Sequence, residues 1–335
     1  MHLHPPSAAR MTRRYLGLAA LAAASVLATG GAWAQGGLSD KPITIVVGFA
    51  PGAGTDMLAR AIGEQLSRRL KQTVVVENKP GAGGTLAVNS VAKAQADGNT
   101  LLFAPNTLVI APHVQKAGSH HAHVLNDLVP VTQVTSSTLV IVAHPQLGVK
   151  NAKDLASKAR TQPGLAFGTA GNGTPQHIVG ELYGRSTGVD LTHVPYRGTG
   201  PALVDLMGGS LSFAISSLGA AIPYIQSGKM VAVAVPEKQR TPLLPEVPTL
   251  SEQGIQGVEV SGWFGLLAPK GTPSARIDKL NSEMQAILAQ PEIQQKFRAQ
   301  GELPVGSSVE DFGQLLKSEY AKYAQIVNEF NIKTE

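Results

Sequence analysis

Short apolar runs alternate with stretches of helical periodicity along most of the chain. The apolar runs predict strands at residues 43–49, 74–77, 100–104, 139–144, 165–168, 192–195, 211–215 and 230–235. Between the first two, residues 57–70 place Leu58, Ile62 and Leu66 on one face of a helix. Strands that alternate with helices predict an α/β fold with largely parallel sheets.

The end of the chain has helical patterns that follow one another without an intervening strand. Ser307 and Glu310 have the spacing of a capping box, and an apolar stripe from Phe312 to Phe330 follows them. We expect these C-terminal helices to pack back on the first part of the chain.

Three glycine-rich turns, at residues 49–56, 80–84 and 168–175, each follow an apolar strand and open a helix. Such turns expose backbone N–H groups at a helix start and let an anion approach without a side chain in the way. The third turn is more than a hundred residues from the first, which indicates two lobes that offer amides to one acidic ligand. The predicted ligand contacts in the first and third turns are Phe49, Gly52, Gly54, Thr55, Ala170, Asn172, Gly173 and Thr174.

Two side chains in these turns have structural interpretations. Asp56 lies in a first helical turn, where a carboxylate is favourable but would repel an anionic ligand, so we expect it to cap or to point away. Thr174 precedes Pro175 and is expected to cap its helix, whether or not it also binds a ligand. The second turn, at residues 80–84, is either a ligand loop or only a helix start.

The remaining site candidates lie at strand ends, where open α/β sheets place their ligands. They are Asn106, Thr107, Tyr196, Arg197, Ser216 and Ser217. Arg197 could hold a distal carboxylate in a bidentate pair. The alternative for Arg197 is a solvated charge, and for Asn106 a turn that uses the amide for local hydrogen bonds.

The first 34 residues have the features of a secretory signal peptide. Arg10, Arg13 and Arg14 form a basic region, a short apolar stretch follows, and Ala32-Trp33-Ala34 fits the cleavage rule. A membrane anchor is disfavoured because a span takes roughly 20 apolar residues. We expect a periplasmic protein that begins near Gln35, with translation starting at Met1 or at Met11.

Composition excludes several classes of site. The formal net charge is +5, of which the leader supplies three arginines, and no Lys/Arg-rich tract with interleaved aromatics follows, so we expect no nucleic-acid partner. The chain has no cysteine and therefore no disulfide or thiolate metal site. His120, His121 and His123 are too closely spaced for a well-formed three-ligand site on one element, so we expect neither a metal nor a cofactor.

Two chain crossings are predicted to join the two lobes. The outward crossing lies near residues 131–138, and the proline-rich segment 238–248 is interpreted as the return path. The predicted organisation is a signal peptide at 1–34, a discontinuous first lobe at 35–137 plus 255–335, and a second lobe at 138–254. Two crossings between α/β lobes make a hinge with a cleft between them.

Several long strings resemble one family, the tripartite tricarboxylate transporter substrate-binding proteins, also called Bug proteins. They are PITIVVGFAPGAGTDMLAR, VVVENKPGAGG, ADGNTLLFA, FGTAGNGTPQH, HVPYRGTGPAL, LPEVPTLSEQG and GLLAPKGTP. The resemblance runs in order from about Lys41 to the C-terminus. It implies a two-lobed periplasmic "Venus flytrap" of type II-like architecture, expected to be a monomer, that binds small carboxylates and delivers them to transporter membrane subunits.

The chain departs from this family pattern at two places. The family often has Asp where this chain has Ser216, so the resemblance implies a ligand without a cationic group. Residues 119–123 replace a Tyr-Asp-Pro turn that relatives usually have.

The function classes left open are a transport receptor, a ligand sensor that presents its bound state to a signalling partner, and an exported α/β enzyme. The chain lacks the G-x-S-x-G, H-E-x-x-H and P-loop motifs. The G-x-G-x-x-G pattern also fails, because Met57 and Leu86 occupy the third glycine position. The sequence therefore favours a binding protein over an enzyme.

Overall fold

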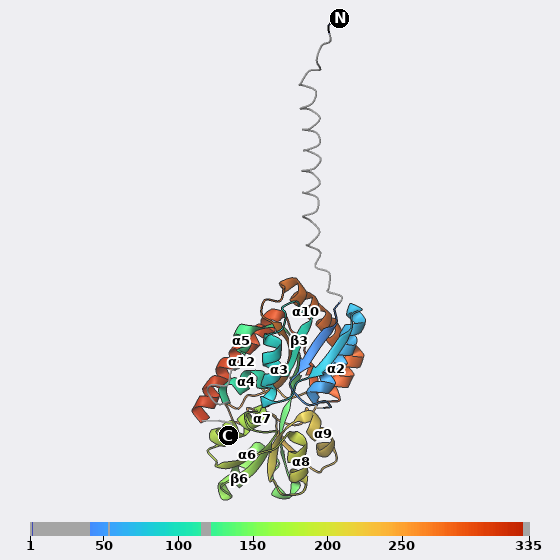
Figure 1. Ribbon diagram of the computed structural model, residues 1–335. Coiled ribbons are helices and arrows are strands. Elements are labelled where there is room, and N and C mark those ends of the chain that lie inside the picture. The colour runs from blue at the N-terminus through green and yellow to red at the C-terminus, as the bar shows by residue number, and fades with distance from the viewer. Residues whose placement is uncertain (1, 3–40, 53, 115–121, 331–335) are drawn as a thin grey trace. The chain divides into compact units, whose positions relative to one another are not determined.

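Two β-sheets, each flanked by helices, define the two lobes of the protein (Figure 1). This computed structural model describes residues 2, 41–52, 54–114 and 122–330. The lobe with the six-stranded sheet is called lobe 1, and the lobe with the five-stranded sheet is called lobe 2. The predicted α/β fold is confirmed.

The sheet of lobe 1 has the order β11-β4-β10-β3-β1-β2. Its strands are β1 (Ile43–Val47), β2 (Val74–Asn78), β3 (Thr100–Pro105), β4 (Leu128–Ser137), β10 (Gly262–Pro269) and β11 (Glu302–Pro304). β1 pairs parallel with β2 and β3, whereas β10 and β11 pair antiparallel with their neighbours. The sheet is therefore mixed and not largely parallel as expected, because the strands that return from lobe 2 run against the βα units.

The sheet of lobe 2 has the order β7-β6-β8-β5-β9. Its strands are β5 (Leu139–Ala143), β6 (Leu165–Thr169), β7 (Leu191–Pro195), β8 (Phe213–Ser217) and β9 (Val231–Ala234). β6 is parallel to β7 and β8, and β5 is antiparallel to β8 and β9. All eight strands expected from the apolar runs are present, with ends shifted by no more than two residues, while β4, β10 and β11 were not predicted as strands.

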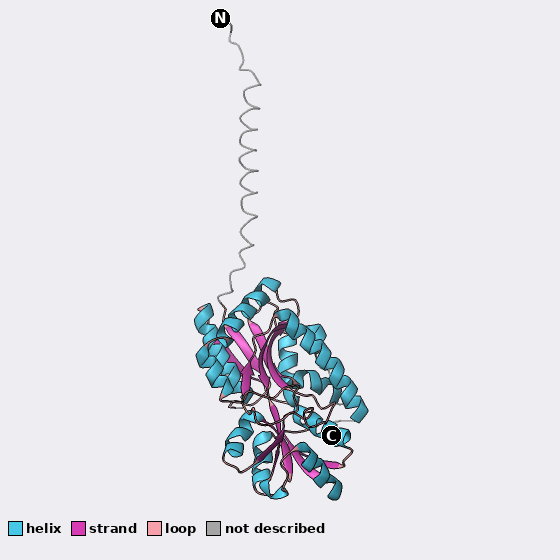
Figure 2. Cartoon of the chain, turned by 180° about the vertical axis from the view of Figure 1, so that it is seen from behind, coloured by secondary structure: helices cyan, strands magenta, loops and turns pink. Residues whose placement is uncertain are grey.

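Helices lie on the outside of both lobes, with the strands between them (Figure 2). The helices are α2 (Gly54–Leu70), α3 (Thr85–Ala92), α4 (Thr107–Val114), α5 (Val124–Asp127), α6 (Ala152–Thr161), α7 (Pro175–Thr187), α8 (Thr199–Met207), α9 (Leu218–Gln226), α10 (Ser274–Leu288), α11 (Pro291–Arg298) and α12 (Val309–Phe330), with 3-10 turns η1 (Ala82–Gly84) and η2 (Pro145–Leu147). Leu58, Ile62 and Leu66 of α2 are buried as the periodicity predicts. The C-terminal α10 and α12 pack on lobe 1.

The start of α12 differs by one residue from the prediction. Ser308, not Ser307, is the capping residue, because its Oγ accepts from the Asp311 N–H and donates to the Asp311 carboxylate. Ser307 instead accepts from the Gln133 N–H, and so ties the loop before α12 to β4. A nearby tertiary partner therefore outweighed the local capping pattern.

The chain passes from lobe 1 to lobe 2 at Thr138, between β4 and β5, and returns between β9 and β10. The predicted return path, residues 238–248, is not the crossing. Leu244 and Val247 are buried in the core of lobe 2, and the Pro248 carbonyl accepts from the Val235 N–H. The prolines thus shape a loop of lobe 2, and the crossing lies between this loop and β10.

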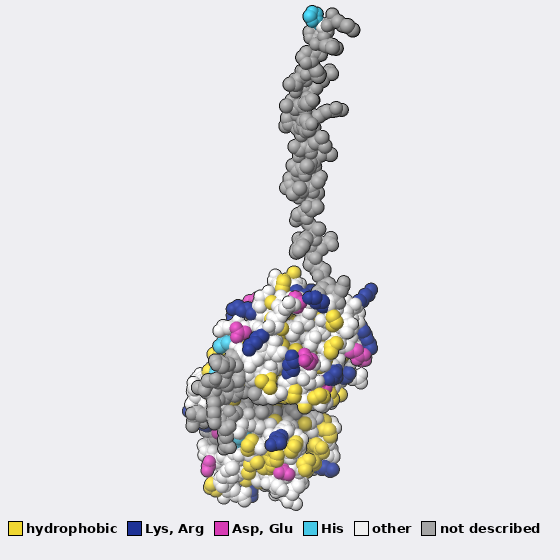
Figure 3. Space-filling view, in the orientation of Figure 1, with side chains coloured by type: hydrophobic (Ala, Val, Ile, Leu, Met, Phe, Trp, Pro, Cys, Tyr) yellow, Lys and Arg dark blue, Asp and Glu magenta, His cyan; other side chains and the backbone are white. Residues whose placement is uncertain are grey.

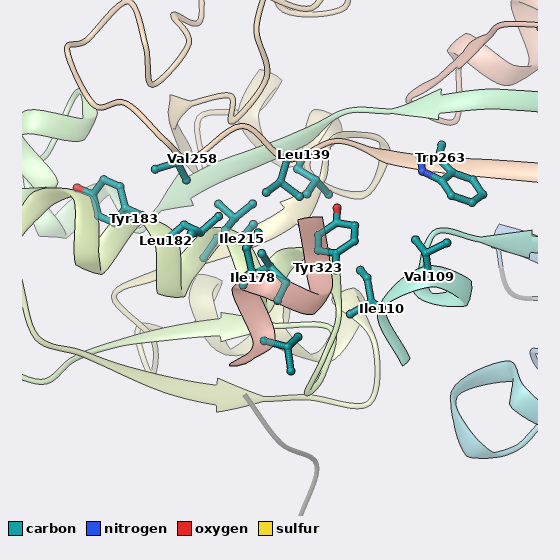
Figure 4. Close-up of a cluster of buried hydrophobic side chains, with 14 of the residues drawn as sticks. Val109, Ile110, Leu139, Ile178, Leu182, Tyr183, Ile215, Val258, Trp263 and Tyr323 are labelled. Carbon is teal, nitrogen blue, oxygen red and sulfur yellow. The ribbon is translucent and has the colours of Figure 1, made fainter. Parts of the chain in front are cut away.

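One cluster of buried side chains continues from lobe 1 into lobe 2. Figure 4 shows Val109 and Ile110 of α4 and Tyr323 of α12 in the same cluster as Ile178 and Leu182 of α7. The face seen in Figure 3 carries Lys/Arg and Asp/Glu side chains of both signs, intermingled. Among the described residues, no helix combines the length and the apolar character that a membrane crossing requires.

Candidate ligand-binding cleft

A cleft of about 730 Å³ is lined by residues of both lobes. This volume is within the range of small-molecule sites, roughly 300–1,000 Å³. Its lining residues are Phe49, Gly54, Thr55, Met57, Leu58, Pro105, Asn106, Thr107, Ser137, Leu139, Ala170, Thr174, Pro175, Gln176, Gly198, Thr199, Gly200, Ser217, Gly219, Ala220, Gly262, Trp263, Phe264, Ala299, Gln300 and Glu302.

Five helices begin at this cleft. α2 and α4 follow β1 and β3 of lobe 1, while α7, α8 and α9 follow β6, β7 and β8 of lobe 2. The first N–H groups of a helix have no partner inside it, and the helix dipole makes this end partially positive. Both walls of the cleft therefore present neutral hydrogen-bond donors with a positive field, which suits an anion.

The first glycine turn is held by Asp56. Its carboxylate accepts from the Gly52 N–H at 2.9 Å, from the Arg60 side chain at 3.0 Å and from Asn78 at 2.8 Å. The side-chain hydrogen bond from Arg60 is the largest cause that lowers the pKa of Asp56 to about 2. Asp56 therefore caps the turn as predicted. The residue with positive φ is Gly52 at +80°, whereas Gly54 has no positive φ.

The third glycine turn uses most of its N–H groups internally. The Gly171 N–H donates to Thr169 Oγ1, the Gly173 N–H to His177 Nδ1, and the Thr174 N–H to the Gly171 carbonyl. Thr174 Oγ1 accepts from the His177 N–H, which confirms the predicted cap of α7. The turn thus faces the cleft mainly through Ala170 and Thr174.

The second glycine turn packs against the first. A Cβ on Gly48 would lie 2.6 Å from the Gly84 Cα, so Gly48 needs glycine for this close approach, whereas Gly84 has a φ of +96° that favours glycine. Gly83 and Gly84 line a separate cavity of about 20 Å³, the size for about one water. The observed role of the second glycine turn is therefore in packing, and none of its residues lines the cleft.

The structure brings together some predicted site residues and not others. Those that line the cleft are Phe49, Gly54, Thr55, Asn106, Thr107, Ala170, Thr174 and Ser217; those that do not are Gly52, Asn172, Gly173, Tyr196, Arg197 and Ser216. Tyr196 donates through its hydroxyl to Asp205 at 2.6 Å, Arg197 is exposed, and Ser216 is fully buried. The Asn106 side chain donates to the Ser261 carbonyl and so fixes the loop before β10.

Sequence reasoning missed the cleft residues that come from β10 and β11. Trp263 lies at the cleft wall, and its indole N–H donates to Glu319 Oε2 at 2.6 Å. Glu302 is the only ionisable side chain among the described cleft-lining residues. Burial raises the pKa of Glu302 and of Glu319 to about 7.

Histidines are found beside the third glycine turn. His177 and His193 stack with ring centroids 3.7 Å apart, and His193 Nε2 lies 2.6 Å from Thr169 Oγ1. Burial, with a further contribution from His177, lowers the pKa of His193 to about 4. His120 and His121 lie outside the described residues, and the described residues contain no group of three potential metal ligands.

The fold and the cleft together define a two-lobed periplasmic binding protein. Residues 58–332 match the family described as "Tripartite tricarboxylate transporter family receptor". The chain belongs to this family of periplasmic solute-binding proteins, which confirms the resemblance. The family implies a periplasmic location, whereas the predicted signal peptide lies outside the described residues except for His2.

Three similar proteins support this assignment. The chain is 35% identical to Protein BugT of Bordetella pertussis over 294 residues, 88% of this chain and 90% of BugT. It is 31% identical to R. palustris Rpa4515 with adipate, with a TM-score of 0.78 over 90% of this chain and 99% of that chain. It is also 31% identical to MatC (Rpa3494) from Rhodopseudomonas palustris with bound malate, with a TM-score of 0.72 over 86% of this chain and 99% of that chain.

Proposed function

We propose that this protein captures a small carboxylate in the cleft between its lobes and delivers it to the membrane subunits of a tripartite tricarboxylate transporter. The observation that carries the proposal is the set of five helix N-termini, from both lobes, at one cleft. Among the described lining residues there is no Lys, Arg or His. The negative charge is therefore held by backbone amides and hydroxyl groups.

The binding mechanism follows from the position of these helices. A carboxylate first meets the N-termini of α2 and α4 on lobe 1. Closure about the two crossings then brings the N-termini of α7, α8 and α9 onto the ligand and expels water. Each helix end contributes up to ~2 kcal/mol to a partly buried anion. The bound ligand stabilises the closed form, which the membrane partner recognises.

The lobes in this proposal have the boundaries expected from the sequence, 35–137 plus 255–335 and 138–254. No catalytic step is assigned to the cleft, so the ligand is expected to be released unchanged. Incubation with excess ligand followed by mass spectrometry tests this point, and product formed over many turnovers would contradict it.

A thermal-shift screen tests the proposal as a whole. The panel holds mono-, di- and tricarboxylates together with neutral amides of the same carbon skeletons. A bound carboxylate at 100 times its Kd should stabilise the protein by about 2.7 kcal/mol. Stabilisation by the amides alone, or by no member of the panel, would overturn the proposed function.

A further inference from the structure

Glu302 places a carboxyl group in a cleft whose other described lining residues carry no charge. It is the first residue of β11 and pairs with Ser137 of β4 at the edge of the lobe 1 sheet. The residue is 7% exposed, and it lines the cleft together with Ser137 and Gln300. Burying a carboxyl in a cleft costs free energy unless partners compensate for it, so the groups around Glu302 indicate its role.

Two hydroxyl groups hold the Glu302 side chain by a single oxygen. Thr135 Oγ1 donates to Oε2 at 2.7 Å, and Ser137 Oγ donates to the same Oε2 at 2.5 Å. Thr135 and Ser137 are two residues apart on β4 and therefore project from the same face of the sheet. Within the described part of the chain, no hydrogen bond engages Oε1. The carboxyl is thus oriented with one oxygen available to a ligand.

Glu302 and the helix starts of lobe 1 come from strands that are not neighbours in the sheet. In the sheet order, β4 and β10 separate β11 from β3, which leads into α4. Three strand spacings amount to ~14 Å. A ligand whose carboxylate sits at α2 and α4 therefore extends toward Glu302.

The helix start nearest Glu302 is that of α9. A Cβ on Gly219 would lie 1.9 Å from the Gln300 carbonyl, so α9 begins directly against the turn that precedes Glu302. The positive end of α9 therefore lies beside this turn. The nearest charged residue along the chain, Arg298, is exposed and donates to Gln294.

A second ligand carboxylate beside Glu302 would put two like charges into a poorly solvated site. An ammonium, hydroxyl or amide group would instead donate to Oε1. We propose that Glu302 is a specificity-determining residue that selects carboxylates whose far end carries a hydrogen-bond donor over those that end in a second carboxylate. This inference rests on the proposed function, and it revises the expectation, drawn from Ser216, of a ligand without a cationic group.

The test compares ligands of equal chain length in calorimetric titrations at pH 8. The probes are adipate, 6-aminohexanoate and 6-hydroxyhexanoate, with the other members of each series from four to eight carbons. The wild-type protein should bind the amino or hydroxy probe at least about tenfold more tightly than the dicarboxylate of the same length. Glu302→Gln should shift that ratio at least about tenfold toward the dicarboxylate, and Glu302→Asp should retain the wild-type preference.

Glu283→Gln is the matched control, because Glu283 of α10 is also a buried carboxylate but is not among the residues that line the cleft. It should leave the ratio unchanged, and circular dichroism confirms that each variant is folded. A ratio that is the same in wild type and folded Glu302→Gln would overturn the inference and leave the proposed function standing. Binding of no carboxylate to the wild-type protein would overturn both.

Discussion

The indole N–H of Trp263 donates a hydrogen bond to a carboxylate oxygen of Glu319, with 2.6 Å between Nε1 and Oε2. Trp263 belongs to the wall of the ligand cleft, whereas Glu319 lies on α12. The ring of Trp263 also meets Phe312 of α12 edge-on, with centroids 5.3 Å apart. The C-terminal helix therefore fixes the orientation of a nearly buried side chain whose residue lines the cleft.

Trp263 should report ligand binding through its fluorescence. The two tryptophans of the chain are Trp33 and Trp263, so a protein that begins at Gln35 has only Trp263. A ligand that fills the cleft and draws the lobes together changes the surroundings of this residue and should change its emission. The change should saturate at the ligand concentration found by calorimetry. A saturating calorimetric signal with constant emission would argue against this placement of the ligand.

The buried carboxyls predict a specific pH dependence of stability. Glu302 and Glu319 have pKa values raised by burial to about 7, above a value of about 4.5 for an accessible group. Between these values the folded protein binds more protons than the unfolded chain, so each group lowers stability as pH rises from about 4.5 to 7. Glu319→Gln keeps an acceptor for Trp263 but removes the charge. The melting temperature of Glu319→Gln minus that of the wild type should be more positive at pH 8 than at pH 5. An equal difference at both pH values would contradict the raised pKa of Glu319.

His193 predicts a pH dependence of stability with the opposite sign. Its pKa is lowered by burial to about 4, below the ordinary value of 6.5. The unfolded chain therefore binds more protons between these values, and the contribution of His193 to stability is lost as pH falls from about 6.5 toward 4. His193→Phe keeps a ring beside Phe167 and His177 but cannot be protonated. Denaturation curves should show a smaller loss from pH 7 to pH 5 in this variant, and a loss as large as wild type would refute the role of His193.

Thr174 serves both the fold and the cleft. Thr174→Ala removes the cap of α7 and should lower the free energy of unfolding by ~1 kcal/mol. It should also weaken ligand binding, because Thr174 lines the cleft. Thr174→Ser keeps the hydroxyl and should restore both quantities in denaturant unfolding and calorimetry. Wild-type stability and wild-type affinity in Thr174→Ala would show that the Thr174 hydroxyl contributes neither to the stability of the fold nor to ligand binding.

Local patterns predicted the elements with strong periodicity. The strands of the βα units and α2 could be predicted because each is a short apolar run or an apolar stripe. β4 could not, because Pro130 interrupts it and its buried face includes Thr132 and Thr135. The crossing after residue 248 was misplaced because prolines mark a loop without saying which lobe it packs on.

The cleft could be predicted only where one turn defines it. Gly54 and Thr174 stand at helix starts that the sequence itself marks. Ser216 and Ser217 show the limit of reasoning from strand ends. Alternate residues of a strand face opposite sides, so Ser216 is buried while Ser217 lines the cleft. Glu302 comes from an edge strand whose partner is far away in the sequence, so only the sheet order brings it to the site.

The central claim, that both lobes hold one carboxylate, is tested by two glycines. Gly54 opens α2 on lobe 1, and Gly200 lies in the first turn of α8 on lobe 2; both line the cleft. Neither has a positive φ, and among the described residues no atom outside the chain neighbours and the helix's own backbone lies within 4 Å of a Cβ built on either. Valine at these positions should leave the fold intact and extend into the space that the ligand needs.

The decisive measurement is calorimetric titration of these variants with the carboxylate that most stabilises the wild-type protein. Gly54→Val and Gly200→Val should each weaken binding at least about tenfold, since a misfit side chain costs roughly 1–3 kcal/mol. Gly208→Val is the matched control, at the other end of α8 with a φ of −75°, and should bind as wild type does. If either folded cleft variant binds the ligand with wild-type affinity, the claim that both lobes hold the carboxylate is contradicted.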